Sequence, residues 1–489
     1  MYGAPPSAAV ELADDGEPLT VAARGESAHP SAAPRDFVLG VILLQAAGGL
    51  ALGLPGHLSV DSIVQLYEAR TLHFISFHPP MMSLLLRVLD GWGHGTASFV
   101  VLDQLLLTAS FALLFWQRES HLRWPAAVAA APVVLNPLVL AYTGIVWKDV
   151  LMVYLATFGY VCLYVASNRS GSRRIASALG AVLALALAAS ARQHALVLAL
   201  PGAVYGALLL SDRPATRWGL ALLLCAGVVG INIAIVAYAD SVAVGEQVPR
   251  TEAGLRSLAI FDLAGIAANG GAIPDAAVAA QVSAAFVPSY IPAQMGTLPE
   301  PVAGSPLWRM KIPDLLALWG RTILHSPRAY LSHRAAHFGD LLWRPCLLMY
   351  SGVKSTVYVP SLGRDIMPEL GLAGRWDRRD RELKRWSDLL RNTTPMFNPV
   401  FGSVVLAVCA AALWRRDGAS ALVVFAASTF LYSLAFAVIG LSCDFRYLYI
   451  LPVAATVLLL ALIAGARSAG RGGAEPRHAQ RDYDPQRSG

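Results

Sequence analysis

The chain alternates long apolar blocks with short polar turns, a pattern that predicts membrane-spanning helices. Each block is about 17–25 residues long, the length that a helix needs to cross the hydrocarbon core of a bilayer. Lipid leaves the edges of an open sheet unsatisfied, so the spans are expected to be helical. About ten spans are predicted, with limits at 37–57, 97–116, 124–143, 147–166, 175–191, 194–211, 218–237, 398–414, 419–441 and 447–466. The expected fold is therefore an all-α polytopic membrane protein.

Two long polar segments interrupt the spans and indicate how the chain is divided. The second is large enough for a small subdomain outside the membrane. The predicted divisions are a tail at 1–36, a transmembrane core at 37–237 that includes a first outer loop at 58–96, an outer segment at 238–397, C-terminal transmembrane helices at 398–466 and a tail at 467–489. Both tails are rich in small and polar residues, which predicts disorder. The N-terminal tail lacks the basic and short apolar regions of a cleavable signal peptide, so the first span is expected to remain as an anchor.

Composition agrees with a membrane protein and argues against a nucleic-acid partner. The 489 residues are 56% hydrophobic and 14% charged, whereas about 25% of the residues in soluble domains are charged. The net charge is +6, but the arginines lie in short loops and in the C-terminal tail instead of forming one basic patch.

The five cysteines do not form a metal-binding pattern. Cys162, Cys225 and Cys409 fall inside apolar spans, where cysteine is typically a small core residue. Cys346 and Cys443 fall on the predicted outer side, and the sequence leaves open whether they form a disulfide. There is no CxxC motif and no histidine–cysteine cluster with zinc spacing, so no metal ligands are predicted.

Positive charges in the short loops predict the orientation of the spans. One set of loops carries Arg118, Arg123, Arg169, Arg173, Arg174, Arg213, Arg217, Arg415 and Arg416, and the Arg-rich tail follows the last span. The positive-inside rule places these loops and both termini in the cytoplasm. The expected location is the cytoplasmic (inner) membrane, with several spans.

The short loops on the opposite side have few ionisable residues. Those they do carry are Lys148, Asp149, Arg192, His194, Asp444 and Arg446. Positive charges on the outer side oppose the topological bias and need another explanation. Ion pairs between helix ends are one explanation, and a shared polar site is the other. Adjacent residues on a helix do not face each other, so local pairing is poor. Ionisable groups at membrane level tend to mark function, which favours the shared site.

The first outer loop contains the stretch DSIVQLYEARTLHFISFHPP, which predicts a short helix at the membrane surface. One face carries Asp61, Gln65 and Glu68, and the opposite, apolar face carries Ile63, Leu66 and Tyr67. The acids are expected to turn inward over the bundle. Two roles for Asp61 stay open, because it suits the N-cap of this helix and also a position where a hydroxyl must lose its proton.

His78 lies in a Pro-Pro break before a second amphipathic helix that is expected to start near Met81. A histidine in such a place is more often a hydrogen-bonding brace than a catalyst. Lys148 and Asp149 are expected at the outer start of a span, where the helix dipole favours a phosphate.

Arg192 and Arg446 suit phosphate because the guanidinium fork binds two oxygens. His194 shares a turn with Arg192, and Tyr447 follows Arg446. Tyr447 suits an aromatic belt at the membrane interface as well as a site. Acids, cations and aromatic residues on one membrane face indicate group transfer from a phosphate-bearing lipid to a hydroxyl.

In the order and topology of these motifs, residues 37–210 resemble the GT-C superfamily of polytopic glycosyltransferases. The protein O-mannosyltransferases and the aminoarabinose transferase of lipid A belong to this superfamily. Asp61 resembles the catalytic acid of the family, and Asp149, in a Trp-Lys-Asp context, resembles its second acid. Many members follow the first acid with Glu, whereas this chain has Ser62. The FRYLY element near Arg446 extends the resemblance more weakly.

The resemblance implies a membrane glycosyltransferase with its active site on the outer face. The donor would be a polyprenyl-phosphate sugar and the acceptor a glycan, a lipid or a protein. No cofactor is implied, and a role for a divalent metal stays open. Asp61 would deprotonate the acceptor hydroxyl during a single inverting displacement at the sugar C1. The implied catalytic residues are Asp61 and Asp149, and the substrate-binding residues are Glu68, His78, Lys148, Arg192, His194, Arg446 and Tyr447.

Two other functional classes stay open. A transporter or flippase for a lipid-linked anionic sugar would also gather cations on one face, and it is expected to show charges or broken helices near the bilayer midplane. An O-antigen polymerase or ligase is expected to place arginine clusters in large outer loops. A purely structural role is least favoured, because it does not account for the outer charges.

Overall fold

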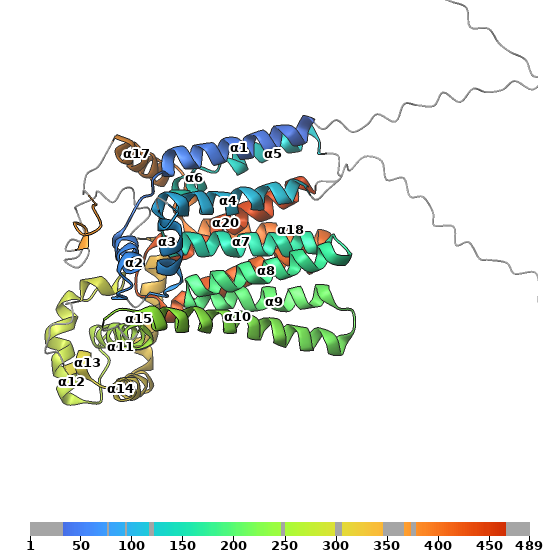
Figure 1. Cartoon of the computed structure of the whole chain (residues 1–489). Helices are drawn as coiled ribbons and strands as arrows, with labels where there is room; N and C mark the ends of the chain where they lie inside the picture. Colours follow the sequence, from blue (N-terminus) through green and yellow to red (C-terminus); the bar gives the residue numbers. More distant parts are fainter. Residues whose placement is uncertain are drawn as a thin grey trace, which may run out of the picture.

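In the computed structural model the protein is a bundle of long helices with a helical layer across one end (Figure 1). The structure describes residues 33–75, 78–92, 95–116, 122–245, 250–298, 306–345, 366–372 and 378–465. These residues form no strand, although His57 bridges Ile145 and Gln294 bridges Ser442. The predicted all-α class is confirmed. Most of the tail predicted at 1–36 and nearly all of the tail predicted at 467–489 lie outside the described residues.

Within the described residues, nine helices are long and apolar enough to cross a membrane. They are α1 (Ala33–Gly53), α4 (Gly95–Trp116), α7 (Lys148–Ser167), α8 (Gly171–Ala191), α9 (Leu196–Leu210) together with the preceding turn η1 (Gln193–Ala195), α10 (Pro214–Val242), α18 (Pro399–Asp417), α19 (Ala421–Ile439) and α20 (Ile450–Ala464) together with the preceding turn η6 (Phe445–Leu448). These helices confirm a multi-pass membrane protein. Helix α7 is the innermost, since 83% of its apolar window is buried, against 11% for α10.

A tenth predicted span is broken into two helices. Helix α5 (Trp124–Val134) and helix α6 (Pro137–Thr143) meet at an angle of 46°. Pro137 cannot continue the hydrogen-bond ladder of α5, and the side chain of Asn136 instead accepts a hydrogen bond of 3.0 Å from the Leu138 amide. The Asn136 amide also donates 3.2 Å to Thr456 on α20. The sequence-based prediction had treated 124–143 as one span.

Two short helices, α2 (Val60–Thr71) and α3 (Met81–Asp90), lie at one end of the bundle (Figure 1). Both were predicted, but the apolar face of α2 is not directed toward lipid. Ile63 and Leu66 are only 1% and 2% exposed. The Arg70 side chain of α2 donates a hydrogen bond of 3.2 Å to the Leu370 carbonyl. Residues 366, 367 and 370 belong to the apolar core that also contains Ile63 and Leu66. A later part of the chain thus covers α2.

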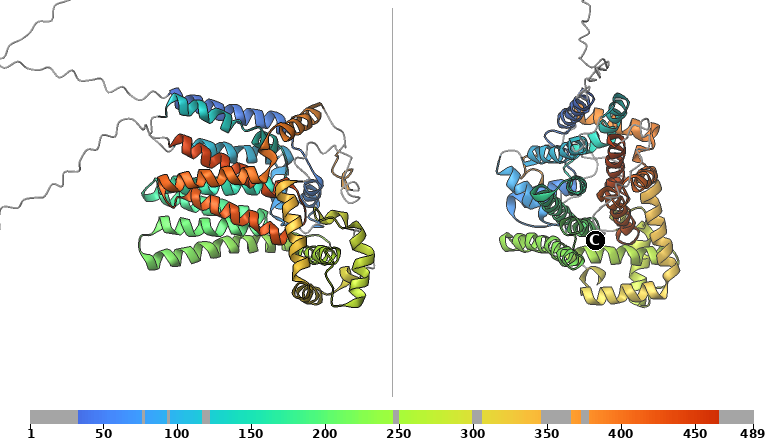
Figure 2. Two further views of the ribbon diagram at one scale, coloured as in Figure 1. Left: turned by 180° about the vertical axis from the view of Figure 1, so that it is seen from behind. Right: turned by 90° about the vertical axis from the view of Figure 1, so that its right-hand side faces the viewer.

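The segment predicted at 238–397 forms a helical layer at the same end of the bundle (Figures 1 and 2). Its helices are α11 (Arg250–Ala268), α12 (Ala276–Gln281), α13 (Pro306–Arg309), α14 (Ile312–His325), α15 (Pro327–Trp343) and α17 (Arg378–Thr393). Helices α11 to α14 enclose an apolar core of their own, which includes Phe261 and Leu315. The turns that carry Arg169, Arg213 and the start of α1 lie at the opposite end (Figure 1).

A buried charged network ties this layer together and attaches it to the bundle. Asp262 of α11 contacts His333 at 2.9 Å and Arg334 at 2.6 Å, both on α15. Trp319 of α14 donates 2.9 Å to the same carboxylate. Arg334 in turn donates 2.7 Å to the Gly440 carbonyl at the end of α19. Because these groups are almost fully buried, losing one partner would leave an uncompensated charge.

The cysteines follow the prediction within the described residues. Cys162, Cys225 and Cys409 are free thiols on spanning helices. Cys443 is disulfide-bonded. The pairing considered for it involves Cys346, which lies outside the described residues.

Candidate functional site

The candidate site forms where the loop after α1 is bound to the loop before α7. The His57 amide donates 2.8 Å to the Gly144 carbonyl, and the Val146 amide donates 3.0 Å to the His57 carbonyl. Gly53 and Gly144 allow the close approach, since a Cβ on Gly53 would lie 2.6 Å from the Gly144 Cα. These contacts fix the start of α2 relative to the start of α7.

Side chains reinforce the same junction. The Trp147 indole donates 2.7 Å to the Ser59 hydroxyl, and the Ser62 hydroxyl donates to the Val146 carbonyl. Ser59 is the N-cap of α2 and forms a capping box with Ser62. The alternative in which Asp61 is only an N-cap is therefore wrong, because Ser59 takes that role and leaves the Asp61 carboxylate for other contacts.

Asp61 is the centre of a cluster drawn from four parts of the chain. Its Oδ2 accepts a hydrogen bond of 2.7 Å from Arg446, in the turn η6 (Phe445–Leu448) before α20. Lys148 Nζ lies 3.6 Å from the same oxygen, and His78 Nε2 lies 3.9 Å from Oδ1. The Asp61 side chain keeps 24% of its surface exposed, so the carboxylate is reachable.

The charges around Asp61 decide its protonation. Burial alone would raise the pKa of Asp61, but the positive charges of Arg446 and Lys148 outweigh that effect and hold the pKa well below its usual value. Burial, followed by the charge of Lys148, lowers the pKa of His78 to about 3. Asp61 is therefore ionised and His78 neutral near pH 7.

A second acid–arginine pair lies beside the first. Asp149, in the first turn of α7 and 1% exposed, forms an ion pair with Arg192 at the end of α8. Arg446 also contacts Asp444 at 3.1 Å. Two arginines and a lysine thus share three carboxylates on one end of the bundle.

Aromatic rings hold both guanidinium groups in place. Arg192 Cζ lies 4.4 Å from the centroid of the Tyr447 ring, and Arg446 Cζ lies 5.3 Å from the same ring. Phe436 stacks on Tyr447 with a centroid distance of 5.1 Å, and Arg446 also lies 5.0 Å from the Trp147 ring centroid. Cation–π contacts of this kind orient arginines as well as stabilise them.

The structure brings seven of the nine predicted site residues into this cluster: Asp61, His78, Lys148, Asp149, Arg192, Arg446 and Tyr447. The Tyr447 ring lies inside the cluster, between the two arginines and Phe436. His194 packs behind it, stacked on Tyr432 at 4.6 Å and edge-on to Phe436 at 4.8 Å.

Glu68 has a different place from the one predicted. Its Oε2 accepts a hydrogen bond of 2.7 Å from the Ser83 hydroxyl, and Glu68 is 1% exposed. It therefore braces α2 against α3 instead of facing a substrate. The physical reason is the packing of α2 against α3, which places Ser83 beside Glu68.

Sequence reasoning missed Trp147 and Phe436, whose rings complete the site. Trp147 could have been found, since it adjoins Lys148 at the turn before α7. Phe436 carries no signal, because it is one apolar residue within a long apolar span. Among the described residues no group of three or more His, Cys, Asp or Glu side chains is placed to hold a metal ion.

Comparison of the chain with protein-family models, with curated proteins and with solved structures gave no match. The chemistry must therefore be argued from the cluster. Its ionised carboxylate can accept a proton from a hydroxyl. Its lysine and arginines can bind a phosphate through charge-assisted hydrogen bonds.

Proposed function

We propose that the protein transfers a sugar from a polyprenyl-phosphate donor to an acceptor hydroxyl on the outer face of the membrane. One observation carries the proposal: Asp61, Lys148 and Arg446 converge from distant parts of the chain at one end of a multi-pass bundle. A base beside two phosphate-binding cations is what such a transfer requires.

The donor phosphate would compete with Asp61 for its cations. Without donor, Arg446 and Lys148 neutralise the carboxylate and keep its pKa low, which makes it a weak base. A phosphate that takes hydrogen bonds from Arg446 and Lys148 draws them away from Asp61, and the pKa of the carboxylate rises toward a value suited to proton transfer. Donor binding thus activates the base.

The reaction then balances as one displacement. The acceptor oxygen attacks the sugar C1, the bond from C1 to the phosphate oxygen breaks, and the acceptor proton passes to Asp61. The polyprenyl phosphate leaves with the extra negative charge, which Arg446 and Lys148 stabilise. Attack opposite the leaving group inverts the configuration at C1. The ion pair with Asp149 holds Arg192 in the same cluster as these two cations.

The experiment is a transfer assay with purified protein and a panel of radiolabelled polyprenyl-phosphate sugars, using membrane extract as the source of acceptor. The proposal expects one donor to give product with inverted C1 stereochemistry, and product on the outer surface of right-side-out vesicles. Absence of transfer from every donor, with folded protein, would reject the proposal.

A transporter of a lipid-linked anionic sugar is the second candidate, and Asp103 favours it. This residue lies about 12 Å along α4 from its outer start, at 1.5 Å per residue, and is fully buried. Neither carboxylate oxygen has a hydrogen-bond partner among the described residues. Together with the break between α5 and α6, it is a feature expected of a transport path.

A further inference from the structure

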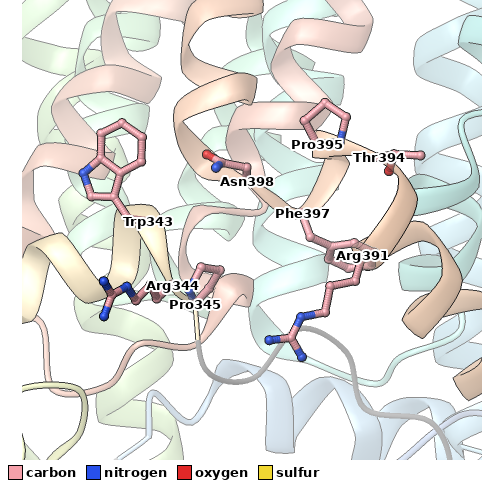
Figure 3. A pocket seen from close by; sticks show the side chains of 8 residues that line it. All are labelled: Trp343, Arg344, Pro345, Arg391, Thr394, Pro395, Phe397 and Asn398. Carbon is pink, nitrogen blue, oxygen red and sulfur yellow. The ribbon is translucent and has the colours of Figure 1, made fainter.

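A second polar pocket lies between the helical layer and the bundle, apart from the Asp61 cluster. Its volume is about 420 Å³, within the range of roughly 300–1,000 Å³ that is typical of small-molecule sites. Figure 3 shows Trp343, Arg344 and Pro345 on one side and Arg391, Thr394 and Pro395 on the other, with Phe397 and Asn398 between them.

The two arginines of this pocket have no partner within the part of the chain that the structure describes. Neither the Arg344 nor the Arg391 guanidinium makes an ion pair or side-chain hydrogen bond among the described residues, and both residues are exposed. Other arginines of the layer are engaged, such as Arg334 with Asp262 and Arg256 with two carbonyls. Two guanidinium groups without partners on one pocket indicate an anionic ligand, and their fork geometry suits phosphate.

The pocket adjoins the start of a spanning helix. Asn398 is the N-cap of the spanning helix α18, so the pocket opens where the chain enters the membrane. Trp343 and Trp386 are 63% and 60% exposed, and Leu389 on the amphipathic helix α17 is 51% exposed. Exposed tryptophans beside basic residues are typical of a helix at the membrane interface.

An aromatic contact connects this pocket to the Asp61 cluster. Phe397, at the end of the turn η5 (Pro395–Phe397), lies 5.4 Å from Phe445 between ring centroids. Phe445 directly precedes Arg446 in the chain. The pocket and the cluster are thus neighbours with separate linings.

We infer that this pocket binds the phosphate of a lipid, with Arg344 and Arg391 as its ligands and the Trp343 and Phe397 rings against the adjoining organic group. Two sources supply this chemistry: a bilayer phospholipid and a polyprenyl-linked phosphate. The inference does not depend on the proposed glycosyl transfer, because it concerns binding alone.

The test is calorimetric titration of the purified full chain in an uncharged detergent. The probes are dihexanoyl phosphatidylglycerol and farnesyl phosphate, with dihexanoylglycerol and farnesol as their neutral counterparts. The variant is Arg344→Gln/Arg391→Gln. The matched control is Arg321→Gln/Arg328→Gln, which removes two exposed positive charges of the same helical layer. Because farnesyl phosphate also suits the Asp61 cluster, the pocket variant and its control are titrated again in an Arg446→Gln background, which weakens binding at that cluster.

We expect at least one phosphorylated probe to bind about tenfold more weakly for each pocket arginine removed, both in the wild-type chain and in the Arg446→Gln background, with no change in the control. The probe whose affinity falls in the pocket variant identifies the source of the phosphate. Equal affinity of the pocket variant and wild type for both phosphorylated probes would overturn the inference, and so would equal binding of the neutral counterparts. The single variants Arg344→Gln and Arg391→Gln keep the test decisive if the double variant unfolds.

Discussion

The substitution Arg446→Gln separates a catalytic role of the Asp61 cluster from a structural one. It removes the 2.7 Å hydrogen bond to Asp61 and the 3.1 Å contact with Asp444. Breaking a buried ion pair destabilises a protein by about 3–5 kcal/mol. Because Asp61 keeps 24% of its surface exposed, we expect about 2–3 kcal/mol.

The effect on catalysis should be larger than the effect on stability. In the proposed reaction Arg446 binds the departing phosphate, where negative charge develops. Removing one donor of this kind lowers kcat by about 10²–10³. We therefore expect Arg446→Gln to stay folded at the assay temperature and to lose kcat by that factor.

Arg416→Gln is the matched control. Arg416 pairs with Asp417 at 2.6 Å, and the two side chains are 24% and 20% exposed, but the pair lies at the other end of α18, away from Asp61. Both variants should show a lowered unfolding midpoint in a thermal scan, and only Arg446→Gln should lose kcat in the transfer assay. The reasoning is refuted if both variants lose kcat equally or if Arg446→Gln stays within threefold of wild type.

Further predictions test the helical layer, the protonation of the site and the rival function. Asp262→Asn leaves buried cations without their counter-charge, so its free energy of unfolding, measured by denaturant titration, should fall by about 3 kcal/mol; an unchanged value would show that the network is not stabilising. Because the lowered pKa keeps Asp61 ionised in the donor-free protein, kcat/KM should not fall as the pH is lowered from 7 to about 4. In Arg446→Gln the acid limb should move to higher pH, and an unmoved limb would contradict the assignment. If the protein is a transferase, Asp103→Asn should leave the transfer rate within about twofold of wild type. The transporter is favoured if wild type shows no transfer and Asp103→Asn loses the uptake of lipid-linked sugar into vesicles.

The spanning helices were predictable because block length alone carries the signal. Any apolar run of about 20 residues is long enough to cross a bilayer, and α1, α7 and α19 lie close to their predicted limits. The break before Pro137 was visible in the sequence, but the apolar run continued across it and concealed the bend. Asp103 was overlooked for a similar reason, since one acid hardly changes the hydropathy of a long apolar block.

The partners within the site were less predictable than its members. The outer charges identified Asp61, Lys148 and Arg446 because each opposes the topological bias or lies beside a span. Which acid meets which cation depends on packing between residues 385 apart in the chain, as for Arg446 and Asp61. The place of Glu68 could not be predicted either, because its contact with Ser83 depends on how α2 and α3 pack together.

The most direct test of the central claim compares Asp61→Asn with Asp90→Asn. Asp90 is 23% exposed and pairs with Arg70 at 2.9 Å, so it matches Asp61 in exposure and in having an arginine partner, but it lies on α3. Both variants are assayed for transfer from the polyprenyl-phosphate sugar that wild type uses. The account predicts that Asp61→Asn loses about 10²–10⁴ in kcat while Asp90→Asn stays within a few-fold of wild type. Equal turnover by Asp61→Asn and wild type would contradict it.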